Sequence, residues 1–118
     1  MRTTTPTMPF EFGDVVLVPF PFTNQAARKQ RPAIVISNAT YNGARPDVIL
    51  MAVTSRMRAD PIPGDAVLQD WQVAGLIKPS LAKPVFATFE QGIVIRRLGT
   101  LAAGDRAAVR DALAASIG

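Results

Sequence analysis

The sequence predicts a mainly β fold, a small barrel or sandwich completed by one C-terminal helix. Its 118 residues are enough for one compact domain with one core, and we expect 1–118 to form that domain. Ten prolines and eight glycines indicate many turns, and short apolar runs recur between them. Frequent strands joined by short connections are typical of an antiparallel barrel or sandwich, not of a helix bundle.

Six strands are predicted where apolar, mostly β-branched runs are bounded by turn residues. They cover 15–20, 32–37, 47–54, 65–68, 80–89 and 93–98. The first and third runs are apolar on both faces, which indicates burial on two sides, as in a small barrel. Pro84 interrupts the fifth strand, and Asn42-Gly43 indicates a turn between the second and third.

One helix is predicted, over 102–117, because this segment is rich in alanine. Val109, Leu113 and Ile117 recur at intervals of four and form an apolar stripe that we expect to pack on the barrel. The Thr- and Pro-rich residues 1–9 are expected to form a loose tail.

The amino-acid composition excludes several kinds of functional site. The absence of cysteine excludes disulfides, thiolate metal sites and cysteine nucleophiles, and the absence of histidine leaves carboxylates alone for a zinc site, so we expect no metal and no cofactor. The net charge of +4 fits a nucleic-acid partner and equally fits ordinary solubility. No apolar run approaches the length of a membrane span and no secretory signal is present, so a cytoplasmic protein is expected.

The most informative stretch is a predicted hairpin of 13–23 and 31–37. Its polar connection carries Arg28, Lys29 and Arg31. A loop held by two buried strands is a frequent place for a functional site, and three positive charges within four residues suit a polyanion.

Five segments of the chain form a recognisable series: Gly13-Asp14-Val15-Val16-Leu17-Val18, Arg31-Pro32-Ala33-Ile34-Val35-Ile36-Ser37, Val53-Thr54-Ser55, Gly75-Leu76-Ile77-Lys78-Pro79-Ser80 and Arg97-Leu98-Gly99-Thr100-Leu101. Taken in order, these motifs resemble the MazF/PemK family of toxin endoribonucleases over nearly the whole chain, from Gly13 to Gly118. The resemblance implies an SH3-like barrel of the MazF/PemK/CcdB type that works as a homodimer. It also implies the toxin component of a type II toxin-antitoxin system, which cleaves single-stranded RNA without a metal and is blocked by a cognate antitoxin.

The family's catalytic arginine falls on Arg31 and its catalytic threonine on Thr54. A guanidinium is a planar fork suited to phosphate, so we expect Arg31 to stabilise the charge that grows on the phosphorane and Thr54 to donate a hydrogen bond. The expected products are a 2′,3′-cyclic phosphate and a 5′-OH. Further RNA-binding residues are predicted, with Lys83 given less weight: Arg28, Lys29, Ser55, Arg56 and Lys78.

Many family members carry a glutamate in the loop before the arginine, whereas 23–30 contain no carboxylate here. The general base is therefore left open. So are an ion-pair role for Arg31 with Asp14 or Glu90, a gyrase-poisoning toxin of the same fold, and a catalytically weak RNA-binding module. The aromatic residues are expected in the core more than as stacking platforms for bases.

Overall fold

The computed structural model describes residues 10–19 and 29–118. The predicted tail 1–9 and most of the predicted cationic loop, including Arg28, lie outside the described residues. The elements, in chain order, are β1 (Asp14–Pro19), β2 (Gln30–Val35), α1 (Ala39–Ala44), β3 (Asp47–Thr54), β4 (Ala66–Val67), β5 (Leu81–Glu90), the 3₁₀ turn η1 (Gln91–Ile93), β6 (Arg96–Thr100) and α2 (Ala103–Ile117).

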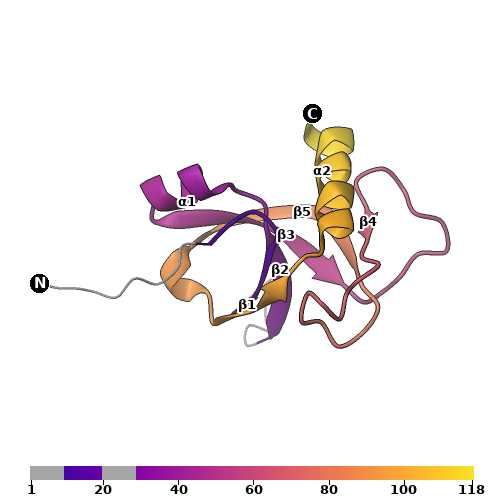
Figure 1. The fold of residues 1–118 in the computed structure, drawn as a ribbon, viewed down its shortest axis with the longest axis horizontal. Helices are drawn as coiled ribbons and strands as arrows, with labels where there is room; N and C mark the ends of the chain where they lie inside the picture. The colour runs from indigo at the N-terminus through magenta and orange to yellow at the C-terminus, as the bar shows by residue number, and fades with distance from the viewer. Residues whose placement is uncertain (1–9, 20–28) are drawn as a thin grey trace, which may run out of the picture.

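The strands form one curled antiparallel sheet in the order β4-β5-β3-β2-β1-β6, with α2 packed against it (Figure 1). The prediction of a mainly β fold with a C-terminal helix is confirmed. Neither helix in the described part of the chain has the length and apolar character needed to cross a membrane.

Both faces of the central strands are buried, which explains why these strands are apolar throughout. On one face Val15, Ile34 and Met51 pack with Val109 of α2. On the other face Val16 and its neighbours form a second cluster, against which Phe10 and Phe89 pack. Because side chains alternate between the two faces of a strand, two buried faces leave few positions for polar residues.

Helix α2 has the predicted extent within one residue but buries a different set of side chains. Val109 is fully buried, whereas Ile117 is 67% exposed, so the predicted stripe is wrong at its end. In Figure 1 the C-terminal end of α2 rises away from the sheet. Asp105 is buried instead, and its carboxylate accepts the backbone N–H groups of Gln69 at 2.9 Å and Asp70 at 2.8 Å.

The predicted Asn42-Gly43 turn is a short helix in the structure. Asn38 caps α1 by accepting the N–H of Tyr41 at 2.9 Å. Asn42 is buried, and its side-chain amide donates to the carbonyl oxygens of Phe10 at 2.8 Å and Ser37 at 3.0 Å. These contacts, the first with a residue 32 positions away, override the local turn preference.

The last strand begins later than predicted, at Arg96 instead of residue 93. The side-chain amide of Gln91 donates to the carbonyl oxygens of Asn42 at 2.8 Å and Arg45 at 3.1 Å, and its backbone N–H donates to Pro46. This anchor folds 91–93 into a 3₁₀ turn, so the chain enters β6 only after it.

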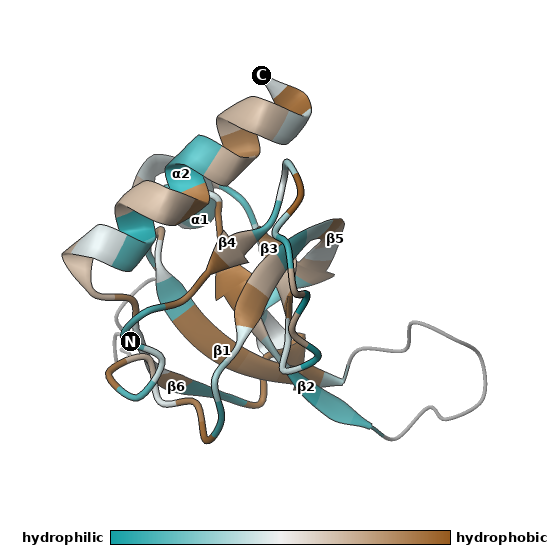
Figure 2. Cartoon of the chain, turned by 90° about the vertical axis from the view of Figure 1, so that its right-hand side faces the viewer, coloured by the Kyte–Doolittle hydropathy of each residue, from teal (hydrophilic) through white to brown (hydrophobic). Residues whose placement is uncertain are grey.

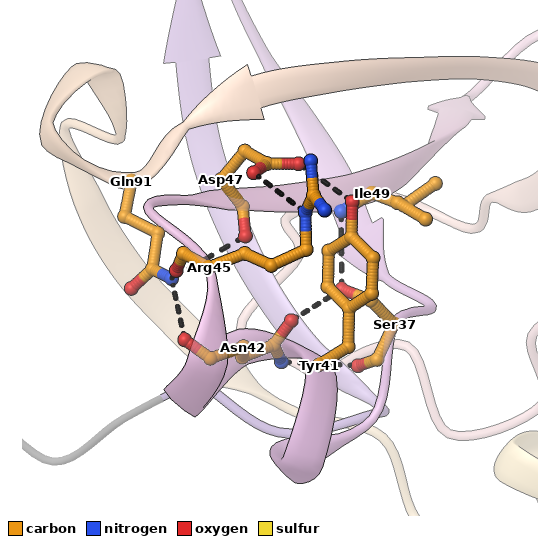
Figure 3. A network of polar contacts seen from close by, with 7 residues as sticks. All are labelled: Ser37, Tyr41, Asn42, Arg45, Asp47, Ile49 and Gln91. Atoms are coloured by element: carbon orange, nitrogen blue, oxygen red, sulfur yellow. Dashed lines mark hydrogen bonds and ion pairs between the residues drawn. The ribbon is translucent and has the colours of Figure 1, made fainter.

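Figure 3 shows the polar network around α1, which lies where β2 ends and β3 begins. The Tyr41 hydroxyl donates to Asp47 at 2.6 Å, and Arg45 pairs with the same carboxylate at 3.2 Å. The hydrogen bond from Tyr41, with help from Arg45, holds the pKa of Asp47 below its ordinary value. The same hydrogen bond raises the pKa of the Tyr41 phenol. This network stabilises the end of the sheet at which β3 begins, opposite to the end that carries Thr54.

Candidate functional site: a cationic cleft where β2 begins and β3 ends

Arg31 and Thr54 are brought together by the pairing of β2 with β3. The observed register sets Ala33 opposite Ala52 and Ile34 opposite Met51. Continued by two residues, the same register sets Arg31 opposite Thr54, although they are far apart in sequence. Figure 2 shows that β2 changes here from a brown, apolar centre to a teal, hydrophilic N-terminal end.

Two hollows adjoin this pair. The first, of about 260 Å³, has a polar wall that includes Arg31, Thr54, Ser55 and Lys78, and an apolar wall that includes Leu76 and Ile77. The second, of about 400 Å³, is lined by Arg31, Thr54, Arg56 and Lys83 beside small apolar side chains. Because both hollows share Arg31, Val53 and Thr54, these three residues lie on the boundary between them.

The Thr54 hydroxyl is oriented by the backbone that follows it. Its oxygen accepts the N–H of Arg56 at 3.0 Å, a local turn in which the side chain closes on the main chain two residues later. Since the oxygen is already an acceptor, the hydroxyl proton remains available for donation. Thr54 is half-buried at the end of β3, so it combines access with a fixed position.

One wall of the first hollow comes from the segment 70–80, which is held by close backbone packing. Gly75 has a φ of +83°, and a Cβ there would lie 2.2 Å from the carbonyl oxygen of Leu98. A Cβ on Gly99 would lie 2.6 Å from the carbonyl carbon of Ala74. The segment therefore rests directly on β6, with the Ser80 hydroxyl donating to the carbonyl of Lys78 at 2.8 Å.

The cleft is positively charged, and no carboxylate is among the described residues that line either hollow. The ion pairs found between described residues are Arg45–Asp47, Arg58–Asp65 and Arg97–Asp14. The alternative of an Arg31–Asp14 pair is thus wrong, because Asp14 binds Arg97 at 3.0 Å. Glu90 faces Asp47 at the other end of β3, away from Thr54.

The structure gathers most of the predicted site residues in this cleft. Ser55 and Lys78 line the first hollow and Arg56 the second, each beside Arg31 and Thr54. Lys29 is exposed just before β2 but lines neither hollow, and Arg28 lies outside the described residues. The half-buried aromatic residues pack against the two core clusters, as expected: Trp71, Phe86 and Phe89.

Lys83, the residue given less weight as an RNA contact, also lies in the cleft. It lines the second hollow because β5 is irregular here: Phe86 faces Met51, whereas Lys83 faces Ala52. Pro84 within a predicted strand was the available signal, since proline in a strand often marks a bulge. Within the described residues, no three His, Cys, Asp or Glu side chains come together as metal ligands.

The fold and the cleft define a class of small β-barrel-like proteins with a basic groove at one end of the sheet. Residues 11–117 match the family model of PemK-like, MazF-like toxins of type II toxin-antitoxin systems, so the chain belongs to this family. No curated protein sequence is significantly similar to it.

Several solved structures share the fold. An endoribonuclease from a Mycobacterial species in complex with its cognate antitoxin is 18% identical, with a TM-score of 0.75 over 92% of this chain and 94% of the other. The toxin MazF-mt6 of Mycobacterium tuberculosis is 18% identical, with a TM-score of 0.69 over 85% and 91%. A MazE-MazF structure (Form-III) from Deinococcus radiodurans is 25% identical, with a TM-score of 0.67 over 87% and 91%.

Proposed function

We propose that this protein is a metal-independent endoribonuclease that cleaves single-stranded RNA and serves as the toxin of a type II toxin-antitoxin pair. One observation carries the proposal: Arg31 and Thr54 lie side by side on the boundary of two hollows whose charged lining residues are cationic. Family membership and the similarity in fold to solved endoribonucleases support it. We further propose a cytoplasmic homodimer that a cognate antitoxin blocks.

In the proposed reaction the ribose 2′-oxygen bonds to phosphorus and the bond from phosphorus to the 5′-oxygen breaks. The products are a 2′,3′-cyclic phosphate and a 5′-OH: the 2′ proton passes to water, and the leaving 5′-oxygen takes a proton from water. Arg31 binds the non-bridging oxygens, whose negative charge grows in the transition state. Thr54 donates its free hydroxyl proton in a hydrogen bond to the phosphate or to the leaving oxygen.

The proposed rate enhancement comes from charge stabilisation and orientation. The chain has no histidine, and no carboxylate is among the described lining residues. A guanidinium is a poor base near neutral pH because its pKa is above about 12. We therefore assign no protein group as the general base, and we expect the rate to rise with pH without the bell-shaped optimum that a titrating acid–base pair gives.

The test is cleavage of a long single-stranded RNA in excess EDTA, with mass spectrometry of the new ends. The proposal expects cleavage by the wild type, 5′-OH ends, and loss of cleavage in Arg31→Ala and Thr54→Ala. Matched controls are Arg110→Ala on α2 and Thr88→Ala, an exposed β5 residue near the opposite end of β3. Ends bearing 5′-phosphate contradict the mechanism. Binding without cleavage indicates an RNA-binding module, and gyrase inhibition without either indicates a gyrase poison.

A further inference from the structure

The second hollow contains a cation that the proposed chemistry does not use. Lys83 lines it with Arg31, Thr54 and Arg56, and its side chain is only partly exposed. None of the ion pairs formed between described residues includes Lys83. Its ammonium group is a compact charge on a flexible stem and is available to an anionic ligand.

The position of Lys83 is set by a bulge in β5. From Met51 to Ala52 the partner on β5 changes from Phe86 to Lys83, so two residues of β5 are inserted at this point. In a regular ladder Lys83 would face Thr54; with the insertion Leu81 faces Thr54 and Lys83 faces Ala52. Bulges beside functional sites commonly redirect a side chain in this way.

Lys83 is therefore a diagonal neighbour of Thr54, with Cα atoms separated by about 7–8 Å, a gap that a long side chain spans. Arg31 is on the other side of Thr54, on β2. A phosphate bound by both Arg31 and Thr54 would lie at the boundary between the two hollows. Lys83 is displaced from that point along β5, inside the second hollow.

We propose that Lys83 binds the phosphate adjacent to the scissile one, so that the second hollow is a subsite for the neighbouring RNA backbone. This inference rests on the proposed function. An ammonium binds a phosphate as a point charge and reads no base, and contacts of this type position a nucleic-acid strand. The exposed Arg56 adds a third positive charge to the same hollow, beside Lys83 and Arg31, whereas the apolar Leu76 and Ile77 line only the first.

The first arm of the test measures binding to a 2′-O-methyl oligoribonucleotide, which has no free 2′-OH and is not cleaved. The slope of log affinity against log salt should fall by about 0.7 in Lys83→Gln, the value for one lost phosphate contact on a single strand. Lys83→Arg should keep the wild-type slope. Arg110→Gln, which removes a charge outside both hollows, should keep it too. An unchanged slope in Lys83→Gln, or an equal loss in Lys83→Arg, overturns the proposal.

The second arm identifies the phosphate. Once the cut site is mapped, two short RNAs are made. In one RNA a neutral methylphosphonate replaces the phosphate before the scissile one, and in the other it replaces the phosphate after it. At one of these positions the substitution should slow wild-type cleavage about tenfold, equivalent to about 1.4 kcal/mol, and should have no further effect in Lys83→Gln. Independent, additive losses at both positions contradict the assignment. Absence of cleavage by the wild type refutes the proposed function, and the binding arm then still decides whether Lys83 binds phosphate.

Discussion

Gly75 and Gly99 pack backbone to backbone, and neither position has room for a side chain. A Cβ on Gly99 would lie 3.0 Å from the nitrogen of Gly75 and closer still to Ala74, while one on Gly75 would meet the Leu98 carbonyl at 2.2 Å. This contact couples β6, at one edge of the sheet, to the segment that carries Leu76 and Lys78 into the cleft.

Gly99→Ala should destabilise the protein by about 1–3 kcal/mol, because the added methyl meets backbone atoms that cannot rotate away. Moving 74–78 off β6 should also displace the apolar wall of the first hollow and lower RNA cleavage. Urea unfolding and a cleavage assay measure the two effects. Gly104→Ala on α2 is the matched control: nothing lies within 4 Å of its added Cβ. It should stabilise the helix by about 0.5–1 kcal/mol. A Gly99→Ala protein as stable as the wild type contradicts the close packing.

Asp105→Asn should cost about 1–3 kcal/mol of stability, because one of two partly buried backbone N–H groups would face an amide NH₂ in place of an oxygen. Both N–H groups, of Gln69 and Asp70, now bond to the Asp105 carboxylate in the first turn of α2. Thermal unfolding measures the loss. Asp111→Asn, an exposed change on the same helix, should stay within about 0.5 kcal/mol of the wild type. Equal melting temperatures for the two variants would show that the Asp105 contacts contribute nothing.

The parts of the fold that could be predicted from sequence are those decided locally or by burial. The strand 47–54 has the predicted bounds because its apolar run has both faces buried. The position of helix α2 could be predicted from the alanine content of its segment. The helix α1 could not be predicted, because Asn42 is satisfied by Phe10 and Ser37, which are brought to it only by the folded chain.

The candidate site, like the fold, has parts that local sequence predicts and parts that depend on tertiary structure. Arg31 and Thr54 could be identified from their motifs, but their proximity depends on which strands pair and in which register. The location of Lys83 in the cleft could not be predicted, because it depends on a bulge, and sequence indicates that a strand is interrupted without indicating how far the register shifts. The arrangement of these residues in space therefore depends on strand pairing and register, which the local sequence pattern does not determine.

Arg31→Ala should abolish cleavage with little effect on folding. Arg31 is exposed and takes part in none of the ion pairs found between described residues, so its truncation should change the free energy of unfolding by no more than about 0.5 kcal/mol. Parallel urea unfolding and cleavage assays separate the two properties. A fall of many degrees in melting temperature would assign Arg31 a structural role instead.

Asp47→Asn should remove part of the acid dependence of stability. The pKa of Asp47 is below its ordinary 3.8 in the folded protein because Tyr41 donates a hydrogen bond to the carboxylate, with Arg45 beside it. As pH falls, the unfolded chain binds the proton first, so the stabilisation is complete well above pH 3.8 and is lost as pH drops through the lower, folded pKa. Wild type should therefore exceed the variant most near neutral pH, and urea unfolding at a series of pH values should show the gap narrowing toward acid. Asp60→Asn, in an exposed loop, should run parallel to wild type; a gap of constant size for Asp47→Asn would mean that the carboxylate charge does not stabilise the network.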